Sequence, residues 1–156
     1  MLEQSPRHTE PSTSDLISVS LDNRVATVTL GNGRAHPLSL ELIRALHSAI
    51  SDLEKDAEVG AIVLHGPGHI FCAGHDLKEI KHHRGDADNG LAYLRELFDA
   101  CAEMMLALTH CAKPTLAMVD GIATAAGLQL VCACDVAFAS TRATVSLPGV
   151  NNRGFC

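Results

Sequence analysis

The feature that most constrains this chain is an apolar run that leads, through residues with almost no side chain, into a helical segment. The run covers residues 115–119, Asp120-Gly121 interrupts it as a turn, and small residues fill 123–127 before the helical-looking LQLVCAC. Small residues at a helix start leave the first backbone N–H groups open to a ligand, and the helix dipole adds partial positive charge there. Such a start can stabilise an oxygen that carries negative charge. The same residues would also let the helix pack close to its strand, so this stretch alone leaves both interpretations open.

A second stretch repeats this arrangement. Residues 61–64 form a short apolar run, Gly66-Pro67-Gly68 is a loop, and FCAGHDLKEI over 71–80 places Cys72-Ala73-Gly74 directly before a segment that can become helical. Two such units could each direct one N–H group at the same point. Two convergent donors are what a thioester enolate or a tetrahedral oxyanion requires. The pair therefore favours a shared oxyanion-binding site.

Length and composition argue against several classes of function. A chain of 156 residues is long enough for one domain with a sizeable core. Hydrophobic residues make up 47%, but no apolar run approaches the roughly 20 residues that span a membrane, so we expect a soluble protein without a membrane partner. Aromatic residues make up 3%, Trp is absent and the formal net charge is −6, which argues against a nucleic-acid partner. An anionic ligand would need a local basic patch.

The cysteines and the first residues bear on the cellular compartment. The six cysteines show no CxxC pair or other zinc spacing, so we expect reduced core thiols of an intracellular protein and no metal site; they are residues 72, 101, 111, 132, 134 and 156. Residues 1–14, MLEQSPRHTEPSTS, are polar and predict a flexible tail ahead of a core domain at 15–156, not a secretory signal. The acids of this tail fit poorly with a mitochondrial transit peptide, which favours the cytoplasm and leaves mitochondria as the alternative.

Strands and helices are predicted to alternate along the chain. Two runs rich in β-branched residues, 16–21 and 25–30, flank Asp22-Asn23-Arg24 and predict a hairpin. Ser39 can cap a helix whose apolar residues lie at helical spacing up to residue 53. Further predicted elements are strands at 61–64, 115–119 and 136–139, a charged surface loop at 81–90, an amphipathic helix at 91–108, and a strand with a turn at 145–150. This alternation predicts an α/β domain with parallel pairing.

Two motifs, FCAGHDLKEI and VDGIATAAGLQLVCACDVAFAS, resemble in wording and order the crotonase superfamily, the enoyl-CoA hydratase/isomerase proteins. The resemblance extends from Leu16 to the end of the chain, where PGVNNRGFC indicates one branch of the family. It implies repeated ββα turns, the crotonase-like spiral (ClpP/crotonase fold). Crotonase-like domains continue with a glycine-rich loop and C-terminal helices that cover the acyl pocket and help to build trimers. That helical part is missing after Cys156, so we expect a truncated chain, and a homotrimer or hexamer only for a full-length form.

The resemblance also assigns roles to individual residues. The backbone N–H groups of His75 and Ala126 are expected to form the oxyanion hole, with Gly127 adjacent to it. Family members usually have glycine where this chain has Ala125 and Ala126. The ligand is expected to be an acyl-CoA thioester, with coenzyme A as part of the substrate and no separate cofactor. The residues expected to contact the ligand are Arg34, Ala35, Ala73, Asp76, Leu77, Lys78, Gly127 and Pro148.

The two glutamates that hydratases use to place and protonate water fall on Gln129 and Gly149. Neither residue can exchange a proton near pH 7, and acid–base groups contribute about 10²–10⁴-fold each, so we expect poor hydration of enoyl-CoA. The His75 side chain could act as an acid or base, and Asp76 could do so or could cap the following helix. Two functions stay open: an acyl-CoA enzyme of fatty acid metabolism, and a non-catalytic acyl-CoA-binding or assembly protein. A dinucleotide-binding fold is excluded because no GxGxxG opens a helix after a strand.

Overall fold

The N-terminal hairpin forms as the sequence predicts. In the computed structural model, which describes residues 16–150, β1 (Ile17–Asp22) pairs antiparallel with β2 (Val25–Leu30). Asn23 and Arg24 have φ angles of 46° and 66°, the left-handed conformation that a two-residue hairpin turn needs at both central positions. The Arg24 side chain also donates to the Ala57 carbonyl at 3.2 Å, which ties the turn to the loop before the next strand. The predicted tail at 1–14 and the end of the chain, 151–156, lie outside the described residues.

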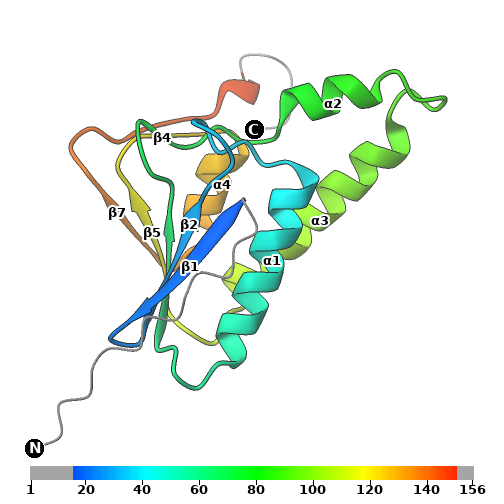
Figure 1. The fold of residues 1–156 in the computed structure, drawn as a ribbon. Coiled ribbons are helices and arrows are strands. Elements are labelled where there is room, and N and C mark those ends of the chain that lie inside the picture. The colour runs from blue at the N-terminus through cyan, green and yellow to red at the C-terminus, as the bar shows by residue number, and fades with distance from the viewer. Residues whose placement is uncertain (1–15, 151–156) are drawn as a thin grey trace, which may run out of the picture.

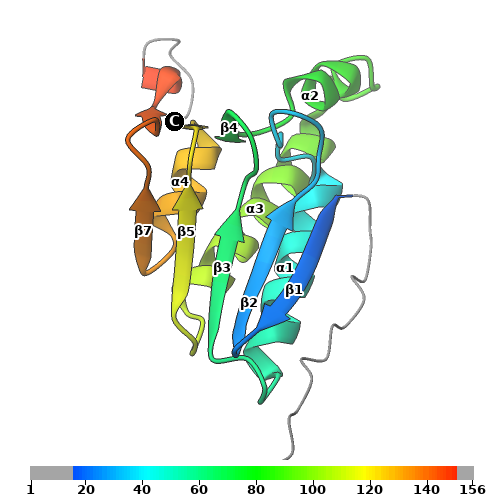
Figure 2. The same cartoon turned by 60° about the vertical axis from the view of Figure 1, so that its left-hand side comes forward.

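Three further strands extend this hairpin into a large sheet. They are β3 (Ala61–His65), β5 (Thr115–Val119) and β7 (Val136–Ala139), and the sheet order is β1-β2-β3-β5-β7. Every pair from β2 onward is parallel, as expected, and Figure 2 shows these strands pointing the same way. All four residues of β7, at the edge of the sheet, are exposed.

A second, small sheet was not predicted. It consists of β4 (Ile70–Cys72), β6 (Ile122–Thr124) and β8 (Thr144–Ser146), all parallel, in the order β4-β6-β8. Residues 123–124 read as part of a small-residue loop in the sequence, because a strand of three residues is too short to show a period. The chain passes from a strand of the large sheet to one of the small sheet and then into a helix, and repeats this, which confirms the predicted ββα spiral (Figure 1).

Two long helices cover one face of the large sheet (Figure 1). Helix α1 (Leu40–Lys55) begins at Ser39, whose hydroxyl accepts from the Leu42 N–H at 3.1 Å, and it buries four residues: Leu42, Ile43, Leu46 and Ile50. Helix α3 (Leu91–Thr109) packs beside α1 and buries Leu97, Met104 and Leu108 among others. Each fully buried side chain of this size contributes about 1.5–3 kcal/mol, so the two helices supply a large part of the core's stabilisation. Within residues 16–150, none of the helices combines the length and apolar content that a membrane crossing needs.

Helix α2 (Leu77–His83) corrects one prediction, because residues 81–83 belong to it and not to the surface loop. The Asp76 carboxylate caps it by accepting from the Lys78 N–H at 2.8 Å, which confirms the capping alternative for this acid. No residue of α2 is buried, so its sequence shows no apolar face. Polar and aromatic contacts hold it instead: the Glu79 carboxylate accepts from the Leu40 N–H of α1 at 3.1 Å, and the His83 ring stacks on Tyr93 of α3 at 3.8 Å.

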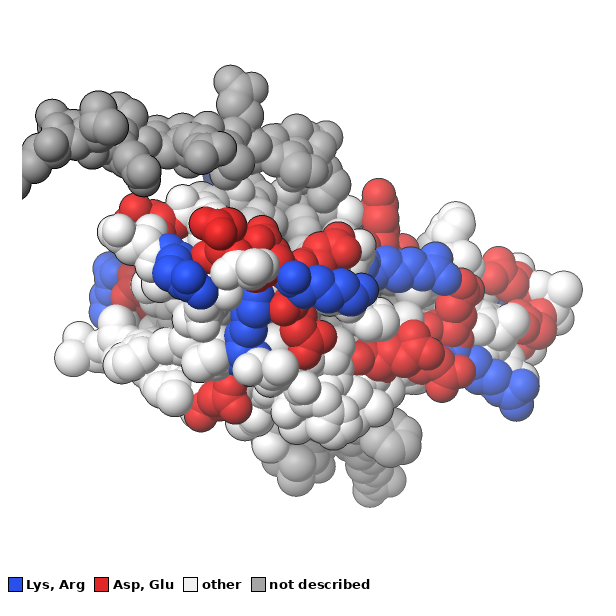
Figure 3. All heavy atoms as spheres, turned by 90° about the horizontal axis from the view of Figure 1, so that it is seen from below, with Lys and Arg blue, Asp and Glu red and all other residues white. Residues whose placement is uncertain are grey.

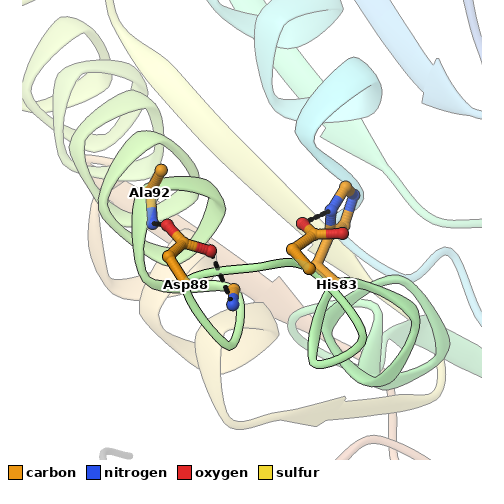
Figure 4. A network of polar contacts seen from close by, with 5 residues as sticks. His83, Asp88 and Ala92 are labelled. Atoms are coloured by element: carbon orange, nitrogen blue, oxygen red, sulfur yellow. Dashed lines mark hydrogen bonds and ion pairs between the residues drawn. The ribbon is translucent and has the colours of Figure 1, made fainter.

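The turn between α2 and α3 is held by side-chain caps (Figure 4). The Asp88 carboxylate accepts from the backbone N–H groups of Ala92 at 2.7 Å and Gly90 at 3.0 Å, and His83 contacts Asp86 at 2.7 Å. The Ala92 and Gly90 donors lower the pKa of Asp88.

The opposite end of the molecule, at the amino ends of the parallel strands, shows acidic and basic side chains interleaved (Figure 3). There Lys113 donates to the carbonyls of Leu53 and Asp56.

Two glycines mark the passages between the sheets and give a test of the fold. A Cβ at Gly66 would lie 2.1 Å from the Phe71 carbonyl oxygen, and one at Gly121 would lie 2.3 Å from that of His69. We expect Gly66→Ala to lower the free energy of unfolding by at least about 1–3 kcal/mol, because a backbone contact cannot be relieved by a side-chain rotation. Gly85→Ala is the matched control, since its Cβ would meet only the His82 oxygen at 3.4 Å. Denaturant unfolding measures the free energy of unfolding of both variants. Equal losses in Gly66→Ala and Gly85→Ala would contradict the tight backbone contact at Gly66.

Candidate functional site

The two small-residue loops meet, as the sequence predicts. Gly74, after β4, has a φ of 84°, and a Cβ built there would lie 3.0 Å from the Ala125 Cβ and 3.1 Å from the Ala126 nitrogen. Ala126 begins the second short helix, α4 (Ala126–Cys132). The loop after β4 and the start of α4 therefore touch, although some 50 residues of chain separate them.

The backbone N–H groups of His75 and Ala126 are both available at this contact. Leu38 pairs with His75 in a parallel bridge, in which the Leu38 N–H donates to Gly74 at 2.8 Å and the Asp76 N–H donates to Leu38 at 3.1 Å. This pattern turns the His75 N–H away from Leu38. Ala126 is the first residue of its helix and has no intrahelical acceptor. No hydrogen bond between described residues uses either N–H. Their role as an oxyanion pair stays a prediction.

Close backbone packing fixes the position of α4. A Cβ on Gly127 would lie 2.2 Å from the Cys72 carbonyl oxygen, so only glycine fits where α4 crosses β4. The Cys72 thiol donates to the His36 carbonyl at 3.2 Å, and burial raises the pKa of this thiol to about 11, so it is a structural donor and not a nucleophile. Gly127 thus lies next to Ala126 at this close contact, and its place beside an oxyanion pair stays a prediction.

Of the residues predicted to contact the ligand, Gly127 lies in α4 and Pro148 begins the 3₁₀ turn after β8, and the other six lie close to the start of α2 or to the loop at Ala35. Ala35 and Ala73 are directly joined, because the Ala73 N–H donates to the Ala35 carbonyl at 3.0 Å. Asp76, Leu77 and Lys78 follow at the start of α2, where Leu77 is 74% exposed. Arg34 and Lys78 are exposed cations beside these groups. Contact of any of them with a ligand stays a prediction.

Gln129 and Gly149, the two positions where the family resemblance predicts glutamates, also lie near the loops. Gln129 is exposed on α4, three residues after Ala126 and so on the same side of the helix. Gly149 is buried in the short 3₁₀ turn Pro148–Val150. This turn follows β8, whose Ser146 carbonyl accepts from the Ala125 N–H at 3.0 Å. Neither Gln129 nor Gly149 supplies an ionisable group.

The His75 side chain makes a contact that the sequence did not reveal. Its ring lies edge-on to Phe98 of α3, with the ring centroids 5.1 Å apart and the planes at 77°. Burial lowers the pKa of His75, so the imidazole is neutral near pH 7. Phe98 lies on the apolar stripe predicted for α3, yet it is 43% exposed, and its position in the stripe gave no signal of this contact. Within residues 16–150, no group of three or more His, Cys, Asp or Glu side chains could hold a metal ion.

Comparison with known proteins places these features in a family. The sequence model of the family Enoyl-CoA hydratase/isomerase matches residues 20–154. The mouse protein named enoyl-CoA hydratase domain-containing protein 3, mitochondrial, is 37% identical over 97% of this chain and 51% of its own length. A probable enoyl-CoA hydratase of Bacillus subtilis is 34% identical over 86% of this chain and 50% of its own length. The chain thus spans about half the length of the curated relatives it matches. The family branch that PGVNNRGFC indicates is the one whose members resemble enoyl-CoA hydratase domain-containing protein 3, and the mouse relative confirms it.

Solved structures share the fold. An enoyl-CoA hydratase/isomerase family protein from Silicibacter pomeroyi superposes with a TM-score of 0.84 and 53% identity, covering 90% of this chain and 59% of its own. Human enoyl-CoA hydratase domain-containing protein 3 superposes with a TM-score of 0.81 and 34% identity, covering 90% of this chain and 54% of its own.

The backbone of Ala125 provides a test of the site geometry. Its φ of 52° and ψ of −127° lie in a region that glycine adopts readily and alanine does not. We expect Ala125→Gly to raise the free energy of unfolding by about 1 kcal/mol, because the relief of strain exceeds the added entropy of the unfolded chain. Ala126→Gly, one residue on and in helical conformation, is the control and should destabilise by up to about 1 kcal/mol. Thermal melting of both variants decides, and a loss of stability in Ala125→Gly would refute the strain.

Proposed function

This chain belongs to the enoyl-CoA hydratase/isomerase family, and on that basis we propose that it binds acyl-CoA thioesters, with the thioester oxygen between the N–H groups of His75 and Ala126. One observation supports this most: Gly74 approaches Ala126 to within contact distance, while both N–H groups have no acceptor among the described residues. Backbone donors fixed in this way need no rearrangement when negative charge develops on the oxygen.

The coenzyme A part of the ligand lies, in this proposal, along the loop at Arg34-Ala35 and the start of α2. The chain as a whole is acidic, with a formal net charge of −6, so the phosphates need local cations. Arg34 and Lys78 are exposed and close in the chain to the joined pair Ala35 and Ala73. Arg34 is suited to phosphate because its guanidinium donates as a planar fork.

The reaction, if one occurs, differs from ordinary hydration in this proposal. Gln129 and Gly149 stand where the family's two glutamates are expected, and each acid–base group contributes about 10²–10⁴-fold. A second candidate, a non-catalytic acyl-CoA-binding or assembly protein, is favoured by these two residues. The first candidate, an enzyme of fatty acid metabolism, is favoured by the paired N–H groups, because binding alone does not require a polarised carbonyl.

Location and assembly belong to the same proposal. The cytoplasmic expectation is untested, and the vertebrate relatives whose names include "mitochondrial" favour the alternative compartment. We therefore place the protein in mitochondria, which subcellular fractionation would test. A homotrimer or hexamer is proposed for a full-length form only.

A direct test measures acyl-CoA binding and crotonyl-CoA hydration side by side. We expect butyryl-CoA to bind more tightly than free coenzyme A, and hydration by the unchanged chain to be close to background. Gln129→Glu combined with Gly149→Glu should raise hydration by at least about 10²-fold, because it restores the acid–base groups. Cys132→Glu, at another exposed position of α4, is the control and should change nothing.

Two outcomes would count against the proposal. If butyryl-CoA bound no better than coenzyme A, the acyl-CoA site would be wrong. If the unchanged chain turned over crotonyl-CoA as an ordinary hydratase does, the assignment of Gln129 and Gly149 would be wrong.

A further inference from the structure

One edge of the large sheet carries backbone groups without partners. Among the described strands β1 pairs only with β2, and Figure 2 shows it at the edge of the sheet beside α1. The Gly31 N–H donates to the Leu16 carbonyl at 2.7 Å, so the even-numbered residues of this strand are the ones that bond β2. The N–H and carbonyl groups of Ile17, Val19 and Leu21 therefore point away from β2, at the free edge.

The sequence of β1 does not protect this edge. Soluble proteins commonly block an exposed edge strand with Lys, Pro, a bulge or a very short length. β1 has six residues, its register with β2 is continuous, and its sequence ISVSLD contains neither Lys nor Pro. The edge is therefore open to an added strand.

A groove lies directly beside this edge, between β1 and α1. Its volume is about 370 Å³, and it is lined by Ile17, Val19, Ala45, Ser48, Ala49, Asp52 and Leu53. A residue added opposite Val19 would have its side chain on the same face of the sheet as Val19, and so in the groove. Because side chains alternate along a strand, every second side chain of an added strand would reach it.

The groove contains one unpaired charge. Asp52 is the only charged residue that lines it, and the Asp52 carboxylate forms no hydrogen bond or ion pair with any residue in the range 16–150. The ends of α1 and β1 lie together, because the Arg24 side chain after β1 donates to the Ala57 carbonyl after α1. Asp52, in the last turn of α1, thus lies toward the Asp22 end of β1. An antiparallel added strand would bring its N-terminal end to this acid.

This charge distinguishes between the occupants that the edge could take. β1 of a second copy would bring Asp22 as its only charged residue, which repels Asp52. Residues 1–15 of the chain include Pro6 and Pro11, which have no N–H to donate to a sheet. A segment that alternates apolar and polar residues and begins with Lys or Arg would satisfy the free backbone groups, the groove and the acid together.

We propose that β1 and the groove beside α1 bind an extended peptide segment of another protein. The segment adds antiparallel to β1, places every second, apolar side chain in the groove, and pairs a Lys or Arg near its N-terminal end with Asp52. In this mode of recognition main-chain hydrogen bonds supply affinity and the side-chain groove supplies specificity. None of the residues that line the groove belongs to the proposed acyl-CoA site, so this function is separate from that one.

The test uses the synthetic peptide acetyl-Lys-Thr-Val-Thr-Val-Thr-amide and the whole 156-residue chain. NMR spectra recorded during a titration give the dissociation constant and the exchange rate of each amide hydrogen. Saturating peptide should slow the exchange of the Val19 and Leu21 amides by at least about 10-fold, because these free donors become bonded. The Ser20 amide, which already bonds β2, is the internal control and should change less.

A pair of variants at one position tests the backbone contribution. Val19→Pro removes the free donor at the edge while the bonds of Ser18 and Ser20 to β2 remain, and it should weaken peptide binding by at least about 5-fold. Val19→Thr, the matched control, keeps the donor and the shape of the side chain and should bind as the unchanged chain does.

A charge reversal tests the specificity. Asp52→Lys should weaken binding of the Lys peptide by about 2–5-fold and strengthen binding of the same peptide with Glu in place of Lys by a similar factor. Glu103→Lys makes an equal change of charge on α3, outside the groove, and should alter neither affinity.

Every other outcome counts against the proposal. Absence of binding, or binding that leaves the exchange of Val19 and Leu21 unchanged, overturns it. Slow exchange of these amides without peptide also overturns it: a dependence on protein concentration would identify a second copy as the occupant, and loss of the protection on deletion of residues 1–14 would identify that segment. Should Val19→Pro fail to fold, the exchange rates and Asp52→Lys decide, and unchanged affinities in Asp52→Lys overturn the proposed partner.

Discussion

The candidate site depends on one close approach between backbones, that of Gly127 to the Cys72 carbonyl. A Cβ at this glycine would lie 2.2 Å from the oxygen, so the first turn of α4 can lie against β4 only because the side chain is absent. That packing sets the distance between the loop after β4 and the start of α4. The contact of the loop at Gly74 with Ala126 follows from it.

Much of the fold could be predicted because its larger elements carry strong local signals. The hairpin around Asn23-Arg24, the Ser39 cap and the apolar stripe of α3 each combine turn or capping chemistry with a clear period. The small sheet could not, since strands of three residues have no measurable period. The end of α2 was predicted at the wrong residue for a related reason. Because α2 buries no residue, its sequence shows no apolar period. Its helical state depends instead on the Asp76 cap and on contacts outside the helix, such as the one between Glu79 and Leu40 of α1.

The site shows the same division between local and distant information. The small residues before two helices predicted that the two loops meet, and they do. Within these loops, His75 and Ala126 were singled out only by the resemblance to a family. The left-handed φ of Ala125 was hidden, because alanine gives no sign of a conformation that glycine usually adopts. The pairing of His75 with Phe98 was hidden as well, since it joins a loop to a helix more than 20 residues away through one ring contact.

The absence of buried residues in α2 has a thermodynamic consequence for any ligand held there. This helix is held by the Asp76 cap, by Glu79, by the stacked His83 and by the half-buried Ile80, and it has no fully buried side chain. Its local opening free energy should therefore be low, so its amides should exchange with solvent sooner than those of α1 or α3. Asp76, Leu77 and Lys78 lie at its start. Part of the intrinsic affinity for a ligand would then be used to hold this helix closed, and the observed dissociation constant would rise in inverse proportion to the closed fraction.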